Sequence, residues 1–179
     1  AAPGERRPLL EVRDLKVHFP VSAGFLIQRK VGAVKAVDGV TFSINSSETL
    51  GLVGESGSGK TTIGRAVTQL EKPTSGQVIF EGRDLLRLPP AEMRGVRRRF
   101  GIIFQDPYGA LNPRMTAGDI IGEPLLAHRV YESKAEYRGR VEQLMEVVGL
   151  HRGMAPRYPH EFSGGQRQRI GIARAISAN

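Results

Sequence analysis

The sequence contains no cysteine. This absence excludes disulfide bonds, zinc sites built from thiolates and a cysteine nucleophile, and it is compatible with a reducing cytoplasm. No apolar run approaches the roughly 18 residues that a membrane-spanning helix needs. The opening segment AAPGERRPLL also lacks the apolar core of a secretory signal. We therefore expect residues 1–9 to form a flexible tail.

The chain is long enough for one domain with a substantial core, and it carries a strong positive charge. It has 179 residues, of which 40% are apolar and 25% charged, and its net charge is +8. The charge fits either a solvated arginine-rich surface or an anionic partner such as a nucleotide, a nucleic acid or an acidic membrane face. The densest basic run, residues 97–99, has no interleaved aromatic residues of the kind that bind single-stranded nucleic acid. Charge alone does not decide the function.

Apolar patterning divides the chain into a strand-rich first part and a helical second part, with the border near Asp106. Helical spacing predicts one helix that begins at Thr61 and ends before Pro73, and another around residues 137–148 that Gly149 ends. A short helix is predicted at 90–99. Alternating or continuous apolar runs predict strands at residues 9–19, 33–44, 48–54 and 100–106, a strand and turn at 77–85, and an irregular connection between the first two strands.

A glycine-rich loop joins the predicted strand at 48–54 to the helix at Thr61. Its sequence GESGSGKTT matches G-x-x-x-x-G-K-[ST], in which backbone N–H groups and a helix N-terminus face a phosphate. A turn that only joins strand to helix does not explain the lysine–threonine pair. The motif predicts that Lys60 reaches the β- and γ-phosphates of a nucleotide and that the Thr61 hydroxyl binds Mg²⁺. The expected nucleotide-binding residues are Gly54, Glu55, Ser56, Gly57, Ser58, Gly59, Lys60, Thr61 and Thr62.

A second glycine-containing turn opens a basic helix in the segment FSGGQRQRIGIARAI. Ser163 and Gln166 have the spacing of a capping box, which by itself predicts a well-capped helix. Capping does not explain Gly164 and Gly165, because glycine in a helix costs about 1 kcal/mol relative to alanine. Glycines leave the helix N-terminus bare, and a bare helix N-terminus binds anions.

These two segments together resemble the ATP-binding cassette family. GESGSGKTT is similar to the Walker A loop of that family, and FSGGQRQRIGIARAI is similar to its signature motif. Together with the segments VKAVDGVTF and IFQDPYGALNPRMT, they resemble the sequences of the ATP-binding subunits of oligopeptide and dipeptide importers. The resemblance extends from about Leu10 onward. The resemblance implies an α/β P-loop NTPase fold with an antiparallel β subdomain and an α-helical subdomain. The implied division is an ATP-binding core with its β subdomain at 10–105, a helical subdomain at 106–165 and the signature helix at 166–179.

The family resemblance also implies roles for individual residues. Two cassettes, identical or different, pack head to tail, so that Ser163, Gly164, Gly165 and Gln166 act on ATP bound by the partner subunit. Gln105 matches the glutamine that approaches Mg²⁺ and the attacking water. The segment at 106–116 is expected near the surface that receives transmembrane permease subunits. The cofactors are expected to be ATP and Mg²⁺.

Adenine stacks on an aromatic residue upstream of the phosphate loop in this family. Phe19 and Phe25 are the candidates in this chain. Core packing or a place in a loop explains either residue equally well.

Part of the family's catalytic machinery has no counterpart in this sequence. We call residues 163–166 the signature turn. The residues after it, 167–179, contain no acidic side chain, whereas the resemblance calls for a Walker B aspartate and a catalytic glutamate there. Asp106, at the end of an apolar run, is a weak alternative to the Walker B aspartate. We therefore expect an N-terminal piece of a longer cassette, in which the C-terminal part of the core sheet is missing. The isolated chain is expected to be inactive as an ATPase.

The leading hypothesis is an energy-coupling ATPase subunit of a membrane importer for oligopeptides or dipeptides. Such a subunit is peripheral, at the cytoplasmic face of the inner membrane, with no direct nucleic-acid contact. The alternatives are a soluble cassette ATPase acting on nucleic acid or the ribosome, a small-molecule kinase in which FSGGQ has no role, and a non-catalytic ATP-binding fragment.

Overall fold

Residues 8–23, 29–106 and 108–178 are described by the structure, a computed structural model. The chain forms two units, Ala1–Met93 and Arg94–Asn179, and each is described here by itself.

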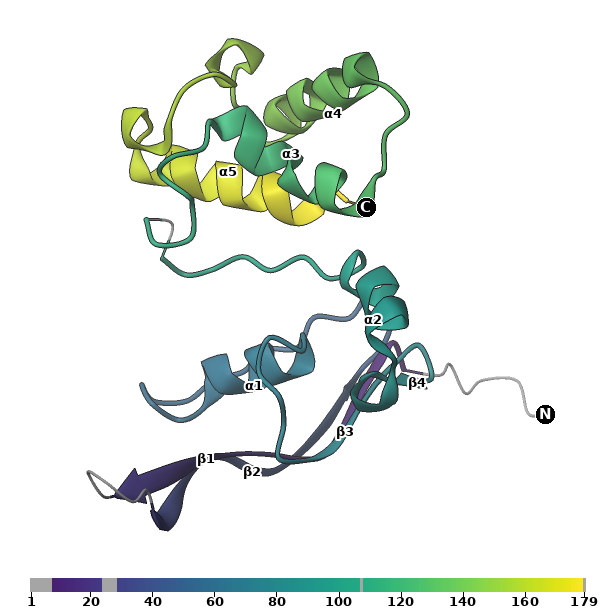
Figure 1. Ribbon diagram of the computed structural model, residues 1–179, viewed down its shortest axis with the longest axis vertical. Coiled ribbons are helices and arrows are strands. Elements are labelled where there is room, and N and C mark those ends of the chain that lie inside the picture. Colours follow the sequence, from purple (N-terminus) through teal and green to yellow (C-terminus); the bar gives the residue numbers. More distant parts are fainter. Residues whose placement is uncertain (1–7, 24–28, 107, 179) are drawn as a thin grey trace, which may run out of the picture. The chain divides into compact units, whose positions relative to one another are not determined.

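The first unit is built on a four-stranded antiparallel sheet of order β2-β1-β3-β4 (Figure 1). Alternating side chains account for its pairing, because buried valines face one another across the ladders, as in Val17 opposite Val37. The predictions of strands in the regions 9–19, 33–44 and 77–85 are confirmed. The strands are β1 (Leu10–Ala23), β2 (Arg29–Ile44), β3 (Ser75–Phe80) and β4 (Arg83–Asp84). The first two are longer than predicted: β1 extends to Ala23 and β2 begins at Arg29.

Two helices begin in the first unit. Helix α1 (Lys60–Val67) packs on β1 and β2 and buries Ile63 and Ala66 (Figure 1). It ends earlier than predicted, because Gln69 turns into the left-handed region at φ 59°. A 3₁₀ turn at Leu85–Arg87 leads to α2 (Pro90–Arg97), which confirms the predicted short helix.

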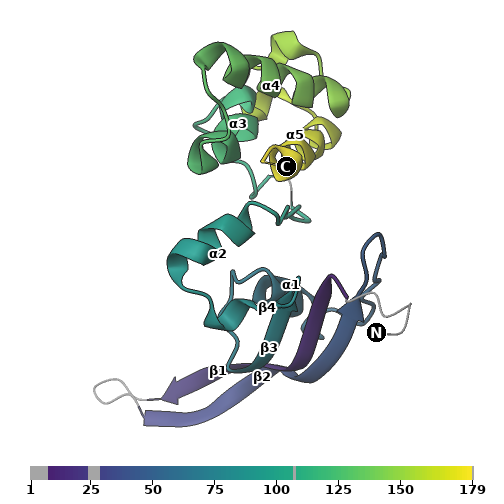
Figure 2. The same cartoon turned by 90° about the vertical axis from the view of Figure 1, so that its right-hand side faces the viewer.

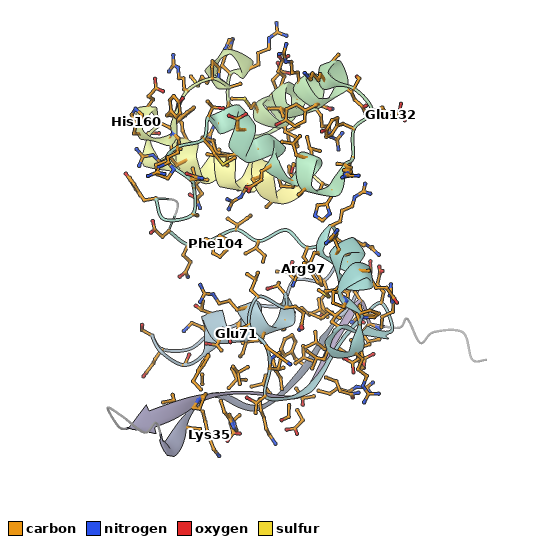
Figure 3. All side chains as sticks on the ribbon, viewed as in Figure 1. Lys35, Glu71, Arg97, Phe104, Glu132 and His160 are labelled. Carbon is orange, nitrogen blue, oxygen red and sulfur yellow. The ribbon has the colours of Figure 1, made fainter. Side chains whose placement is uncertain are left out.

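The predicted strands at 48–54 and 100–106 are wrong, because neither segment forms a strand. Their apolar side chains are exposed: Val53 retains 93% of its accessible surface and Ile103 retains 53%. Figure 3 shows Phe104 on a segment without helix or strand. A continuous apolar run forms a strand only when neighbours pair with its backbone and cover both faces. Within the described residues, no segment pairs with either run.

The second unit is helical, as predicted for the later part of the chain. Three N-caps begin its main helices, because the hydroxyls of Thr116, Ser133 and Ser163 each accept a backbone N–H three residues later. Gly149, at φ 73°, follows the second of these helices, as predicted. The helices are α3 (Ala117–His128), α4 (Lys134–Val147) and α5 (Gly164–Ile176), with 3₁₀ turns at Arg152–Met154 and Pro159–Glu161 (Figure 2).

Helix α5 contributes to the buried core of the second unit. Ile170 and Ala173 of α5 are fully buried beside Ile120 and Ile121 of α3 and Met145 of α4. The helix that carries the SGGQ turn is therefore anchored by its apolar face, while its N-terminus is free to serve another purpose. None of the helices in the described part of the chain could span a membrane.

A close approach between α3 and α4 depends on a glycine. A Cβ at Gly122 would overlap the side chain of Tyr137, with the ring carbon Cζ only 2.5 Å away. Tyr137 also packs against Tyr131, with ring centroids 5.4 Å apart. Burial, followed by the nearby charges of Asp119 and Tyr131, raises the pKa of Tyr137.

The substitution Gly122→Ala should therefore lower the free energy of unfolding by about 1–3 kcal/mol, because the Tyr137 ring must leave its position. Urea unfolding followed by circular dichroism measures the change. Gly139→Ala in α4 is the matched control: its Cβ meets nothing within 4 Å, so it should not destabilise the protein. Equal stability of the G122A variant and the parent protein would contradict the contact.

Candidate functional site

The 54–59 loop reaches α1 through left-handed backbone that favours glycine. Gly57 and Gly59 have φ values of 82° and 90°. At Gly59 a second constraint applies, because a Cβ there would overlap the carbonyl oxygen of Ala36 in β2. The loop is thus seated against the sheet at the point where α1 begins. Ala36 was not anticipated, because its role comes from a backbone carbonyl and no side-chain pattern signals it.

Lys60 folds back over this loop. Its Nζ donates to the carbonyl oxygens of Gly54 at 2.8 Å and Glu55 at 2.5 Å, and to Ser58 Oγ at 3.2 Å. The ammonium group is therefore held at the loop by neutral acceptors. Phosphate oxygens are stronger acceptors for a cation, so an arriving phosphate can take over these bonds.

The N-terminus of α1 has no side-chain cap. Gly59 occupies the N-cap position, and no side chain among the described residues accepts from the first N–H groups of the helix. These donors, with the positive end of the helix dipole, are available to an anion. The Thr61 side chain is exposed and has no hydrogen-bond partner within the described residues, so its hydroxyl is free to bind a metal ion. The geometry of the loop fits a nucleotide phosphate and Mg²⁺.

Gln105 lies in the second unit on the irregular segment that precedes α3. Its side chain is exposed. Asp106 beside it is engaged locally: its carboxylate oxygens accept from the N–H groups of Tyr108 at 2.8 Å and Gly109 at 3.1 Å. These bonds shape a turn, and they disfavour Asp106 as the aspartate that anchors a metal. Thr61 and Gln105 belong to different units, so their joint role toward Mg²⁺ stays a prediction.

The signature turn is a complete capping box. Ser163 Oγ accepts from Gln166 N at 3.3 Å, and Gln166 Oε1 accepts from Ser163 N at 2.9 Å. Ser163 and Gly165 are exposed and Gly164 is half-buried. The turn therefore faces away from the core of its own unit.

Internal packing does not explain the two glycines of this turn. Both have helical backbone without positive φ. A Cβ at Gly165 would meet nothing within 4 Å, and one at Gly164 would meet only the Tyr108 hydroxyl, at 3.9 Å. Alanine would fit at both positions. The space that they leave above the helix N-terminus is open to a group from outside the unit.

Of the two adenine-stacking candidates, one can be placed. Phe19 lies on β1 opposite Val34 of β2, and its side chain is 39% exposed. A partly exposed ring suits a stacking surface. Phe25 lies outside the described residues.

A family model confirms what these segments suggest. Residues 37–179 match the model described as ABC transporter. The chain belongs to this family.

Relatives of known function are similar over nearly the whole chain. The oligopeptide transport ATP-binding protein AppF of Bacillus subtilis is 55% identical, with 96% of this chain and 52% of AppF covered. OppF of Escherichia coli, also an oligopeptide transport ATP-binding protein, is 52% identical, with 96% and 52% covered. The dipeptide transport ATP-binding protein DppF of E. coli is 46% identical, with 96% and 50% covered. The chain spans about half the length of these relatives.

Solved structures confirm the fold class. A dimeric structure of the ATP-binding cassette MJ0796 bound to ADP and phosphate superposes with a TM-score of 0.80 at 28% identity, covering 95% of this chain and 70% of that one. Another dimeric structure of MJ0796, described as a bacterial ABC transporter cassette, gives 0.79 with the same identity and coverage. The mixed α/β architecture with an antiparallel sheet and a helical part is that of the ABC ATPases. The domain borders expected at residues 105 and 165 stay predictions.

The first test of the ABC assignment is Lys60→Ala, which removes the ammonium group from the loop. We expect ATP affinity to fall at least tenfold, because charge-assisted hydrogen bonds contribute about 1.5–3 kcal/mol each. The fold should be retained, since Lys60 is outside the buried core. Titration with a fluorescent ATP analogue measures the affinity. Lys72→Ala, an exposed lysine of the same unit, is the control and should bind like the parent protein; equal affinities for all three would contradict the site.

Proposed function

We propose that this chain is the ATP-binding part of a subunit that hydrolyses ATP to drive a membrane importer of oligopeptides or dipeptides. The observation that carries the proposal is the loop at 54–61, in which Lys60 and an uncapped helix N-terminus converge. The names of the relatives at about 50% identity support the choice of peptides as cargo.

The chain's own residues divide the work on the nucleotide. Lys60 neutralises the β- and γ-phosphates, and the backbone of residues 54–59 holds them in place. Thr61 and Gln105 would hold Mg²⁺, which supplies Lewis-acid stabilisation of the charge on the phosphates. The exposed amide of Gln105 orients the attacking water. In this proposal Phe19 is the remaining described candidate for stacking on adenine.

Ser163, Gly164, Gly165 and Gln166 act on the ATP of a second, similar subunit. The support is physical: the turn is exposed, the apolar face of its helix is buried in the core, and its glycines leave space that none of the described residues of the unit fills. Head-to-tail pairing gives each subunit one phosphate loop and its partner's signature turn. The dimeric cassettes with the same fold support this arrangement.

The remaining partners are transmembrane permease subunits, which place the protein at the cytoplasmic face of the inner membrane without crossing it. The importer names of the relatives support this location. No observation favours nucleic acid or the ribosome as a partner. The positive charge of the chain is then a property of its surface and of its nucleotide site.

The substitution Gly165→Ala separates the two explanations of the signature turn. Since a Cβ at this position has open space, the variant should be as stable as the parent protein or more stable by up to about 1 kcal/mol. If the space receives a phosphate of the partner's nucleotide, the whole protein should lose ATPase activity at least tenfold. Gly171→Ala, in the same helix and with equal space for a Cβ, is the control and should keep its activity. Full activity of the G165A variant would contradict the proposed role.

The proposed function itself is tested by comparing the whole protein with the 179-residue chain. The whole protein should co-purify with membrane permease subunits and hydrolyse ATP. The chain alone should bind ATP but show no turnover, because residues 167–179 provide no carboxylate to activate water. Salt-dependent binding of nucleic acid in place of membrane subunits would overturn the function. Robust ATP hydrolysis by the chain alone would overturn the prediction that this chain lacks the carboxylate that activates water.

A further inference from the structure

The segment that carries Gln105 lies along helix α5 within the second unit. At Gly101 the backbone of this segment runs so close to α5 that a Cβ would lie 2.6 Å from the carbonyl oxygen of Ala175. Farther along, Ile103 and Phe104 share a small pocket with Gly171 of α5. The same helix therefore guides the chain on the N-terminal side of Gln105.

On the other side of Gln105, the contact with α5 is made by an aromatic ring. The guanidinium carbon of Arg167 lies 4.1 Å from the ring centroid of Tyr108, which is within the range of a cation–π interaction. Arg167 is itself fixed, because its Nε donates to the carbonyl oxygen of Pro159 at 2.7 Å. The Tyr108 hydroxyl reaches the signature turn, 3.9 Å from the Cβ position of Gly164.

Burial does not explain this tyrosine. Its side chain is 67% exposed, so the ring contributes little to the hydrophobic core. The Tyr108 backbone is held separately by Asp106, which accepts its N–H. The side chain is therefore free to have a role other than holding the fold together.

We propose that Tyr108 is a positioning residue that couples Gln105 to the signature turn through Arg167. This inference rests on the proposed function, in which Gln105 acts at the subunit's own ATP and the turn acts on the partner's ATP. The contact between Tyr108 and Arg167 fixes the segment around Gln105 relative to the signature turn. A displacement at Gln105 therefore moves the N-terminus of α5 as well. Neither side chain touches the nucleotide in this proposal.

The test uses the whole protein and compares Tyr108→Leu with Tyr108→Phe. Tyr108→Leu removes the ring, and kcat for ATP hydrolysis should fall about two- to fivefold, the factor that corresponds to a surface cation–π interaction. KM should stay within about twofold, because the phosphate loop is unchanged. Tyr108→Phe keeps the ring and should keep kcat. A contact that only stabilises the fold would lower the melting temperature without this split between kcat and KM.

Arg167→Gln removes the same contact from the other side and covers the case in which the leucine variant does not fold. It should lower kcat like Tyr108→Leu, and the double variant should lose no more than the more impaired single variant. Arg169→Gln is the matched control. Arg169 also donates to a backbone carbonyl oxygen, that of Gly149 at 3.1 Å, but it contacts no aromatic ring among the described residues. Its kcat should stay at the parent value.

Three outcomes overturn the coupling: parental kcat in Tyr108→Leu, equal losses in Tyr108→Leu and Tyr108→Phe, or multiplied losses in the double variant. ATP binding by the parent protein and by Lys60→Ala, measured on the same preparations, tests the proposed function independently. If the parent protein hydrolyses ATP and Tyr108→Leu has the same kcat, only the coupling through Tyr108 is wrong. If the parent protein binds no ATP, both the proposed function and the coupling are wrong.

Discussion

The seating of the phosphate loop against the sheet is the constraint on which the nucleotide site depends. Gly59 lies so close to Ala36 that a Cβ would overlap the carbonyl oxygen of that residue. Gly59 also turns the backbone into the left-handed region, and α1 begins at the next residue. Because the first helical residue is Lys60, the same turn sets the starting point of its side chain. The ammonium group then finds the carbonyl oxygens of Gly54 and Glu55. A shift at Gly59 would move the helix dipole and the lysine together.

Much of this architecture is local, and the sequence predicts the local part well. Alternation of apolar residues identifies β1 and β2, and an apolar run followed by a turn identifies β3. The Ser163–Gln166 spacing identifies the capping box that the structure contains. The phosphate loop was recognisable because its chemistry needs particular side chains at a fixed spacing. The family followed from the order of two such motifs.

The predictions that were wrong or missing concern interactions between segments that are far apart in the sequence. The apolar runs at 48–54 and 100–106 have the composition of buried strands, but a strand of this kind exists only when neighbours pair with it and cover it. The described residues supply no such neighbours, and Val53 and Ile103 are left exposed. The contact between Gly59 and Ala36 escaped prediction for a related reason. It joins a glycine to a backbone carbonyl more than twenty positions away, and neither group has a side chain that could signal it.

The glycines of the two motifs differ in the reason for their presence, and this difference bears on function. Gly59 is explained within its own unit, because its backbone angle and its contact with Ala36 both exclude a side chain. Gly165 has neither constraint, since its backbone is helical and a Cβ would meet open space. A glycine that its own unit does not require lowers helix stability without an internal gain. Its position separates it from Gly139 and Gly171, which also have open space for a Cβ: Gly165 lies in the first turn of α5, and an anion is the partner that an exposed helix N-terminus attracts.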